Sequence, residues 1–117
     1  MITLEAMQAD PIAKEAVRYM EMFSRYMKDD EERLNLRISE VEQNQLQGLE
    51  ARERLELLRM SVETSLGMVN SQVTRIEKAM GCCEAQLPQM VGSQLWDVRT
   101  RADAAFRNVN RALERLN

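Results

Sequence analysis

The chain has 117 residues, of which 30% are charged and only 4% are aromatic, and its net charge is -3. Aromatic side chains normally supply much of a globular core, so this composition favours long helices that bury a stripe of Leu, Met, Val and Ala. Four Gly and two Pro are too few for an all-β chain. The absence of His, with only two Cys, excludes the usual zinc sites and the Ser-His and Cys-His catalytic pairs within one chain.

The first ten residues predict a short N-terminal segment followed by a strong helix start. Thr3 is a candidate cap for one or two helical turns, but a helix of that length is marginally stable alone. We therefore expect residues 1–10 to be frayed or packed against a neighbour. Asp10 can accept hydrogen bonds from the amides of a first turn, and Pro11 suits the first helical position, so a helix is expected to begin at residue 11.

The next segment predicts one long helix over residues 11–80. Gly48 and Gly67 lie among strong helix formers, where each Gly costs about 1 kcal/mol without ending the helix. At a rise of about 1.5 Å per residue this helix would be roughly 100 Å long. Gly81 and Pro88 then predict a break or bend at 81–88, and Pro88 can open a C-terminal helix over 89–117.

The start of the long helix has an apolar face wider than a two-stranded coiled coil needs. This Met-rich face is a candidate docking surface for partner proteins, because Met side chains adapt to varied partners. Packing against another helix of the same assembly is the alternative explanation. The candidate partner face consists of Ile12, Ala16, Met20, Phe23 and Met27.

Apolar residues then recur at alternating three- and four-residue spacing, which makes a continuous seam that a lone helix cannot bury. The predicted oligomer interface consists of Leu34, Ile38, Val41, Leu55, Val62, Leu66, Val69, Val73, Ile76, Met80, Cys83, Leu87 and Met90. β-Branched residues at d favour more than two strands, whereas Ile38 and Val73 at a favour two, so we predict a homo-oligomer from dimer to tetramer. The seam weakens at Gln45, Gly48, Arg52 and Arg59, either as a tolerated defect or as a docking site.

The C-terminal segment repeats the spacing in a frame displaced by one residue. Its apolar positions are Leu95, Val98, Ala102, Ala105, Val109, Ala112 and Leu116. The displacement supports a break near Pro88, because a straight continuation would rotate the seam. The C-terminal helix can then fold back on residues 50–80 as a bundle or continue as a bent rod, and both arrangements stay open at this point.

The remaining features bear on location and partners. No apolar run approaches the roughly 18 residues of a membrane-spanning helix, and the N-terminus lacks a signal-peptide pattern, so we expect no membrane span and a cytoplasmic or nuclear protein, or a fragment of one. The adjacent Cys82 and Cys83 cannot staple distant parts of one chain, although Cys83 at a seam position could link two chains. The C-terminal arginines are too sparse for nucleic acid to be the expected partner.

These patterns predict an all-α, elongated coiled coil without catalytic, metal or cofactor-binding residues. The expected function is that of a non-enzymatic oligomerisation scaffold, which self-associates and presents helix faces to partner proteins. The alternative is a hetero-complex adaptor, whose helices complete a bundle with other proteins in a tethering, cytoskeletal or kinetochore-type assembly.

Overall fold

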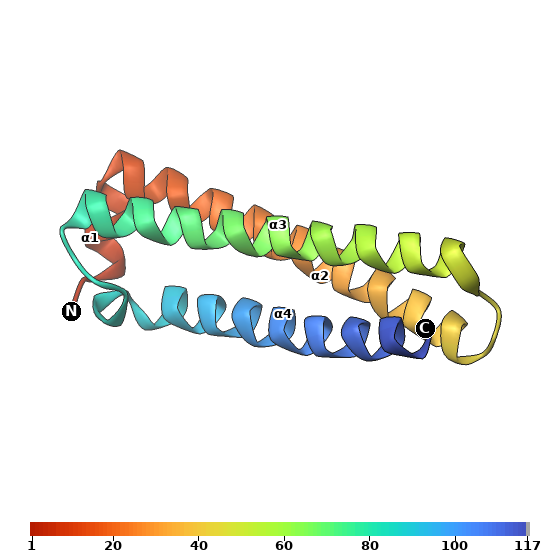
Figure 1. The fold of residues 1–117 in the computed structure, drawn as a ribbon. Coiled ribbons are helices and arrows are strands. Elements are labelled where there is room, and N and C mark those ends of the chain that lie inside the picture. Colours follow the sequence, from red (N-terminus) through yellow and green to blue (C-terminus); the bar gives the residue numbers. More distant parts are fainter. Residues whose placement is uncertain (117) are drawn as a thin grey trace.

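The computed structural model describes residues 1–116, which form an elongated all-α bundle of three long helices (Figure 1). The bundle measures 52 × 19 × 17 Å. Its elements in chain order are α1 (Leu4–Ala9), α2 (Pro11–Glu42), α3 (Gly48–Met80), the 3-10 turn η1 (Glu84–Gln86) and α4 (Gln89–Arg115). The predicted all-α, elongated fold is confirmed. Residue 117, the last residue of the predicted C-terminal helix, lies outside the described residues.

The two N-terminal helices begin at the predicted caps. The Thr3 hydroxyl accepts a hydrogen bond from the Ala6 amide at 3.1 Å, and one Asp10 carboxylate oxygen accepts from the amides of Ile12 and Ala13 at 3.0 and 2.9 Å. These bonds satisfy amides that have no partner inside the helix. Residues 1–10 are packed against a neighbour rather than frayed, because Met7 of α1 is buried in the core.

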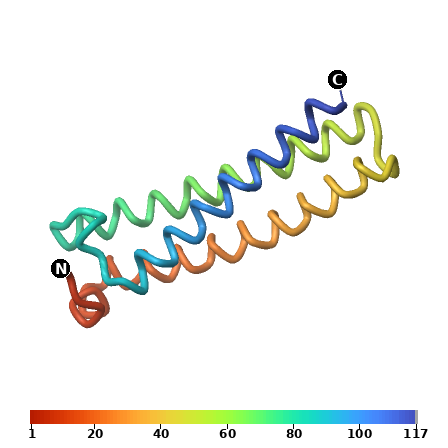
Figure 2. The backbone as a smooth tube through the Cα atoms, turned by 90° about the horizontal axis from the view of Figure 1, so that it is seen from below, coloured from red at the N-terminus to blue at the C-terminus, as the bar shows by residue number. Residues whose placement is uncertain are grey.

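The prediction of one helix over residues 11–80 is wrong. The chain reverses at residues 43–47, so α2 and α3 run antiparallel (Figures 1 and 2). Asn44 and Gly48 have left-handed backbone angles, φ 59° and φ 64°. The Gln45 amide donates to the Glu40 carbonyl at 2.8 Å, which closes α2 with the bonding pattern of a left-handed helix cap. The bundle is therefore about half as long as the single predicted helix.

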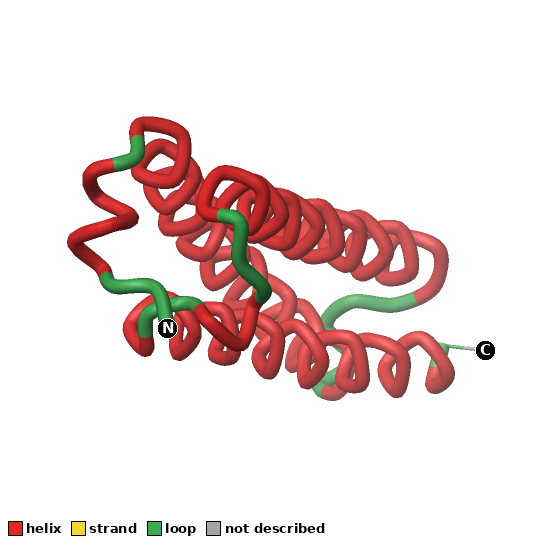
Figure 3. The backbone as a smooth tube through the Cα atoms, turned by 90° about the vertical axis from the view of Figure 1, so that its left-hand side faces the viewer, coloured by secondary structure: helices red, strands yellow, loops and turns green. Residues whose placement is uncertain are grey.

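The predicted break at 81–88 is confirmed. Gly81 ends α3 in a left-handed conformation, and the Cys82 amide donates to the Glu77 carbonyl at 3.1 Å. The chain then passes through η1 to Pro88, which immediately precedes α4. The Ile2 amide donates to the Gln86 carbonyl at 2.8 Å, so the N-terminal segment is tied to this connection. Figure 3 shows α1 and this connection together at one end of the bundle.

The C-terminal helix folds back rather than extending the rod. The helix α4 packs against both α2 and α3, and Figure 2 shows it running between them. Ala102, Ala105 and Ala112 are buried on its inner side, where small side chains allow close helix approach. With three antiparallel helices, the two ends of the chain lie at opposite ends of the bundle (Figure 1).

The core runs the length of the bundle in two adjoining clusters. One joins Met7, Met20 and Met27 to the apolar residues of α3 and the first half of α4, and the other joins the ends of α2 and α4 to the start of α3. Full burial of one such side chain contributes about 1.5–3 kcal/mol. Within residues 1–116, no helix has both the length and the apolar character needed to cross a membrane.

Candidate functional site

The residues of the predicted oligomer interface mostly lie inside the bundle formed by a single chain. Leu66 and Met80 are half-buried, whereas Cys83 and Met90 are exposed. The buried members are Leu34, Ile38, Val41, Leu55, Val62, Val69, Val73, Ile76 and Leu87. Their neighbours are helices of the same chain, so in this fold the seam is unavailable to a second chain.

The candidate partner face at the start of α2 is also largely covered. Ala16, Met20 and Met27 are fully buried in the core, and Phe23 is half-buried beside Tyr26, with their rings 6.1 Å apart in an edge-to-face arrangement. Ile12 alone of the five is exposed. Packing against other helices of the same chain accounts for the buried members.

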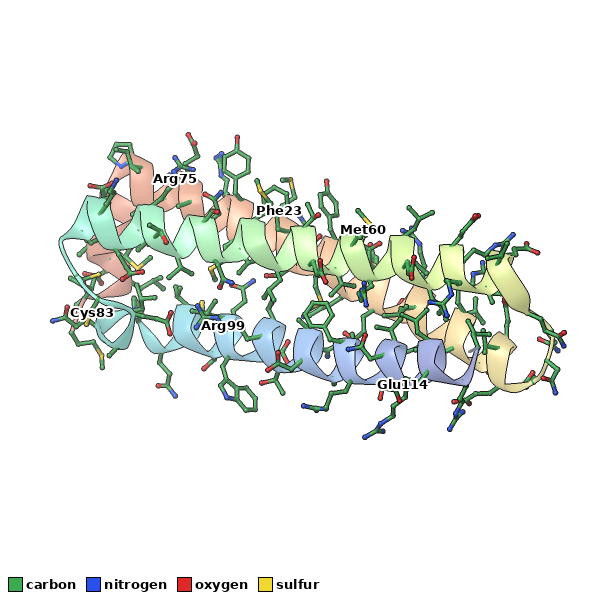
Figure 4. The ribbon with its side chains drawn as sticks, in the orientation of Figure 1. Phe23, Met60, Arg75, Cys83, Arg99 and Glu114 are labelled. Atoms are coloured by element: carbon green, nitrogen blue, oxygen red, sulfur yellow. The ribbon has the colours of Figure 1, made fainter. Side chains whose placement is uncertain are left out.

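A different surface carries the exposed apolar side chains, on the side of α2 and α3 that faces away from α4. Tyr26 lines a depression between the two helices together with Ser61. On α2, Tyr19 lies seven residues before Tyr26 and Met22 lies four residues before it. On α3, Leu57 lies four residues before Ser61 and Met68 lies seven residues after it. Residues at these helical spacings share one side of a helix, so all four lie on the side of the depression. Figure 4 shows Met60 on the same edge of α3. We define the α2–α3 face as Tyr19, Met22, Tyr26, Leu57, Met60 and Met68.

The exposure of these side chains is substantial. Leu57, Met60 and Tyr26 are 65%, 58% and 51% exposed, and Met22 is half-buried. Single exposed apolar residues are normal on a protein surface, but a contiguous set along two adjacent helices is typical of an interaction site. The α2–α3 face is therefore the candidate functional site.

A buried carboxylate fixes the middle of this face. Asp30 on α2 is only 7% exposed, and its carboxylate accepts a hydrogen bond from the Ser61 hydroxyl of α3 at 2.5 Å. Arg33, one turn further along α2, donates to the same carboxylate at 3.3 Å. These bonds satisfy the charge, which would otherwise be costly to bury, and they tie α2 to α3.

Charged side chains border the face in an uneven pattern. Arg25 and Lys78 lie toward the end that contains the start of α2 and the end of α3, whereas Glu32 and Glu53 lie toward the other end. Within residues 1–116, none of these four side chains forms an ion pair or a side-chain hydrogen bond. Among the other charges on this side, Glu15 pairs with Arg75 at 3.0 Å and Glu50 with Arg54 at 2.9 Å, whereas Asp29, near the centre, has no such partner within the described residues.

The opposite side of the pair is occupied by α4, and polar contacts hold it there. Arg99 donates to Asn70 of α3 at 2.9 Å and to Glu84 at 2.9 Å (Figure 4). Lys28 of α2 pairs with Asp97 at 3.6 Å, and the hydrogen bond from Arg101 to Asp97 raises the pKa of that guanidinium. These contacts orient α4, and they leave Trp96, 68% exposed, on its outer surface.

The two cysteines are free thiols at the connection between α3 and α4. Burial raises the pKa of the Cys82 thiol, with smaller contributions from Cys83 and Glu77, so Cys82 carries less thiolate than an ordinary cysteine at a given pH. Cys83 is exposed. Across residues 1–116, no three Cys, Asp or Glu side chains are grouped as a metal site would require.

Comparison with known proteins adds no relative. No protein-family model, curated protein or solved structure matches the chain. The functional argument therefore depends on the residues themselves.

The candidate partner face predicted from the sequence shares no residue with the α2–α3 face. Tyr19, Met22 and Tyr26 belong to the same wide apolar stretch at the start of α2, and Leu57, Met60 and Met68 lie outside the heptad seam. Their signal was apolar side chains at positions that a coiled coil normally leaves polar.

Proposed function

We propose that this chain is a non-enzymatic scaffold that self-associates and presents helix faces to partner proteins. The observation that carries the proposal is the α2–α3 face, a row of exposed Tyr, Met and Leu side chains on the side of the bundle opposite α4. Burying these side chains against another helical surface is favourable, at roughly 25 cal/mol per Å² of apolar area. The association surface proposed here thus differs from the heptad seam, which the chain uses for its own core.

The test is the mass of the full chain in solution, measured by light scattering after size exclusion from about 1 to about 100 μM, a range that covers typical weak to moderate affinities. We expect the mass to rise above that of one chain as concentration increases. Met60→Glu, which places a charge on the exposed α2–α3 face, is expected to reduce association by at least tenfold. Trp96→Glu on α4 is the matched control and is expected to leave association unchanged. A single-chain mass at every concentration would refute the scaffold.

A second candidate function, a hetero-complex adaptor of the tethering, cytoskeletal or kinetochore type, is favoured by Trp96. Trp96 is the only tryptophan of the chain, and it lies exposed on α4, away from the α2–α3 face. Exposed Trp residues are frequent anchors of protein interfaces. The fluorescence of Trp96 should stay that of a water-exposed indole when the protein self-associates. A blue shift of this fluorescence on self-association would contradict a separate role for α4.

We propose a cytoplasmic or nuclear setting for this scaffold. A reducing compartment keeps Cys82 and Cys83 as thiols, which is their state in the fold, and association through the α2–α3 face needs no disulfide. Thiol labelling of the protein in cell extracts prepared under acid quench checks this setting. Complete oxidation of both cysteines would contradict it.

A further inference from the structure

The unpaired charges beside the α2–α3 face are separated by sign along its length. Arg25 and Lys78 make one half positive, and Glu32 and Glu53 make the other half negative. All four side chains are exposed. A surface that is positive at one end and negative at the other is complementary to its own copy when the copy is reversed.

We infer that the α2–α3 face binds a second copy of the chain in an antiparallel arrangement. The twofold axis lies in the plane of the face, passes through its middle and is perpendicular to the helices. This inference rests on the proposed scaffold function and specifies its partner. In this arrangement α2 lies against α2 of the second copy and α3 against its α3, running in opposite directions.

The position of the axis follows from the pairing of α2 with α3. Asp30 contacts Ser61, and Glu15 contacts Arg75, so these pairs lie at equal heights along the bundle. Because α2 and α3 run antiparallel, Tyr26 then lies at the height of Ser65, near the centre of both helices. Lys78 lies 13 residues after Ser65 and Glu53 lies 12 residues before it. A twofold axis at this level therefore brings Lys78 of each chain opposite Glu53 of the other.

The charges on α2 obey the same axis. Arg25 lies one residue before Tyr26, and Glu32 lies six residues after it, so the rotation brings Arg25 within about 8 Å, measured along the helix, of Glu32 of the second copy. Opposite charges on α2 thus also face one another across this axis.

The apolar residues are also distributed so that each half meets the other. Tyr19, Met22 and Met68 lie in the positive half, whereas Leu57 and Met60 lie in the negative half. The antiparallel rotation places Met68 of one chain close to Met60 of the other, because both lie on α3 at nearly equal distances from its centre. An apolar centre bordered by charges is the usual anatomy of a protein interface.

A parallel arrangement fails on the same residues. A twofold axis along the helices would place α2 against α3 of the second copy with their positive halves together. Glu32 would then lie about 9 Å along the helix from Glu53 of the second copy, and like charges across an interface are repulsive. The antiparallel arrangement is therefore the one that the charges select.

The size of the face is sufficient for a stable dimer. The bundle is 52 Å long and 19 Å wide, so one of its sides offers at most about 1,000 Å² in projection. Each partner of a typical stable complex buries roughly 800 Å². A dimer that used about four-fifths of such a side would bury that area.

The test is a charge-reversal cycle in the full chain, with the dimer dissociation constant measured by sedimentation velocity over a concentration series. Glu53→Lys and Lys78→Glu each place like charges opposite one another twice in the dimer, so each is expected to weaken dimerisation by about three- to tenfold. The double variant Glu53→Lys/Lys78→Glu restores both attractions and is expected to return to within about twofold of the wild type.

Rescue within a single chain is ruled out by distance. Lys78 and Glu53 are 25 residues apart on one straight helix, about 37 Å, which is several times the screening length of about 8 Å at physiological salt. The matched controls are Arg107→Glu and Asp103→Lys on α4, where exposed side chains without side-chain partners undergo the same charge changes. These controls are expected to leave dimerisation unchanged, and circular dichroism checks that every variant is folded.

The outcomes separate this inference from the scaffold function. A protein that associates but shows no rescue in the double variant overturns the antiparallel arrangement and leaves the scaffold standing. A monomer at about 100 μM overturns both. Cys83 gives a further check, because the antiparallel dimer holds the two Cys83 thiols at opposite ends of a bundle 52 Å long. Rapid formation of a Cys83-linked dimer on mild oxidation would instead indicate parallel chains and would overturn the inference.

Discussion

Asp30 illustrates how one polar side chain can hold two helices in register. Replacing it with Ala removes the acceptor for the Ser61 hydroxyl and for Arg33. We expect Asp30→Ala to lower the free energy of unfolding by about 1–3 kcal/mol, because a hydrogen bond to a buried charge is lost and its donors are left without that partner. Chemical denaturation followed by circular dichroism measures this change.

The neighbouring residue supplies the control. Asp29 is exposed and forms no ion pair or side-chain hydrogen bond within the described residues. Asp29→Ala removes the same charge and should change stability by no more than about 0.5 kcal/mol. Equal effects of the two substitutions would mean that the Asp30–Ser61 contact contributes nothing beyond net charge.

At the scale of elements, the turn between α2 and α3 decides the fold. Gly48 has φ 64°, a conformation that a Cβ atom strains, whereas Gly67 lies inside α3 with open space where a Cβ would be. We expect Gly48→Ala to destabilise the protein by about 1 kcal/mol or more, and Gly67→Ala to stabilise it by about 0.5–1 kcal/mol. Thermal unfolding of the two variants compares the same substitution in opposite backbone contexts. If α2 and α3 were one continuous helix, both substitutions would be stabilising.

Helix faces were predictable from sequence, but the covering partner was not. The spacing correctly identified the buried sides of α2, α3 and α4, since periodicity depends only on which side of a helix is apolar. It did not reveal that another helix of the same chain covers them. Val41 and Leu55 are separated by two whole heptads, so the heptad frame runs unbroken across the turn that separates them.

The signal for that turn was present in the sequence. Asn44 and Gly48 are the residue types that adopt left-handed backbone angles most readily, and they coincide with the polar gap in the seam. A Gly alone costs too little in a helix to mark an end, so Gly48 by itself does not predict the turn. The α2–α3 face was harder to predict, because it is defined only after α4 has covered the opposite side.

At the scale of the whole molecule, association and folding should be linked. If folded chains bind one another and unfolded chains do not, raising the protein concentration stabilises the folded state. We expect the unfolding midpoint of the wild type to rise with concentration from about 1 to about 100 μM, because above the dissociation constant each tenfold rise in free partner stabilises the folded dimer by roughly 1.4 kcal/mol. Scanning calorimetry at the two concentrations measures the shift. Met60→Glu should abolish it, and a concentration-independent midpoint in the wild type would contradict the linkage.

The number of long helices has a mechanical consequence. Because the number of long antiparallel helices is odd, the described chain begins near one end of the bundle and finishes toward the other, and the bundle is 52 Å long. Anything joined to both ends would therefore be held apart along a rigid strut rather than brought together. An even-numbered hairpin of the same helices would instead act as a clasp.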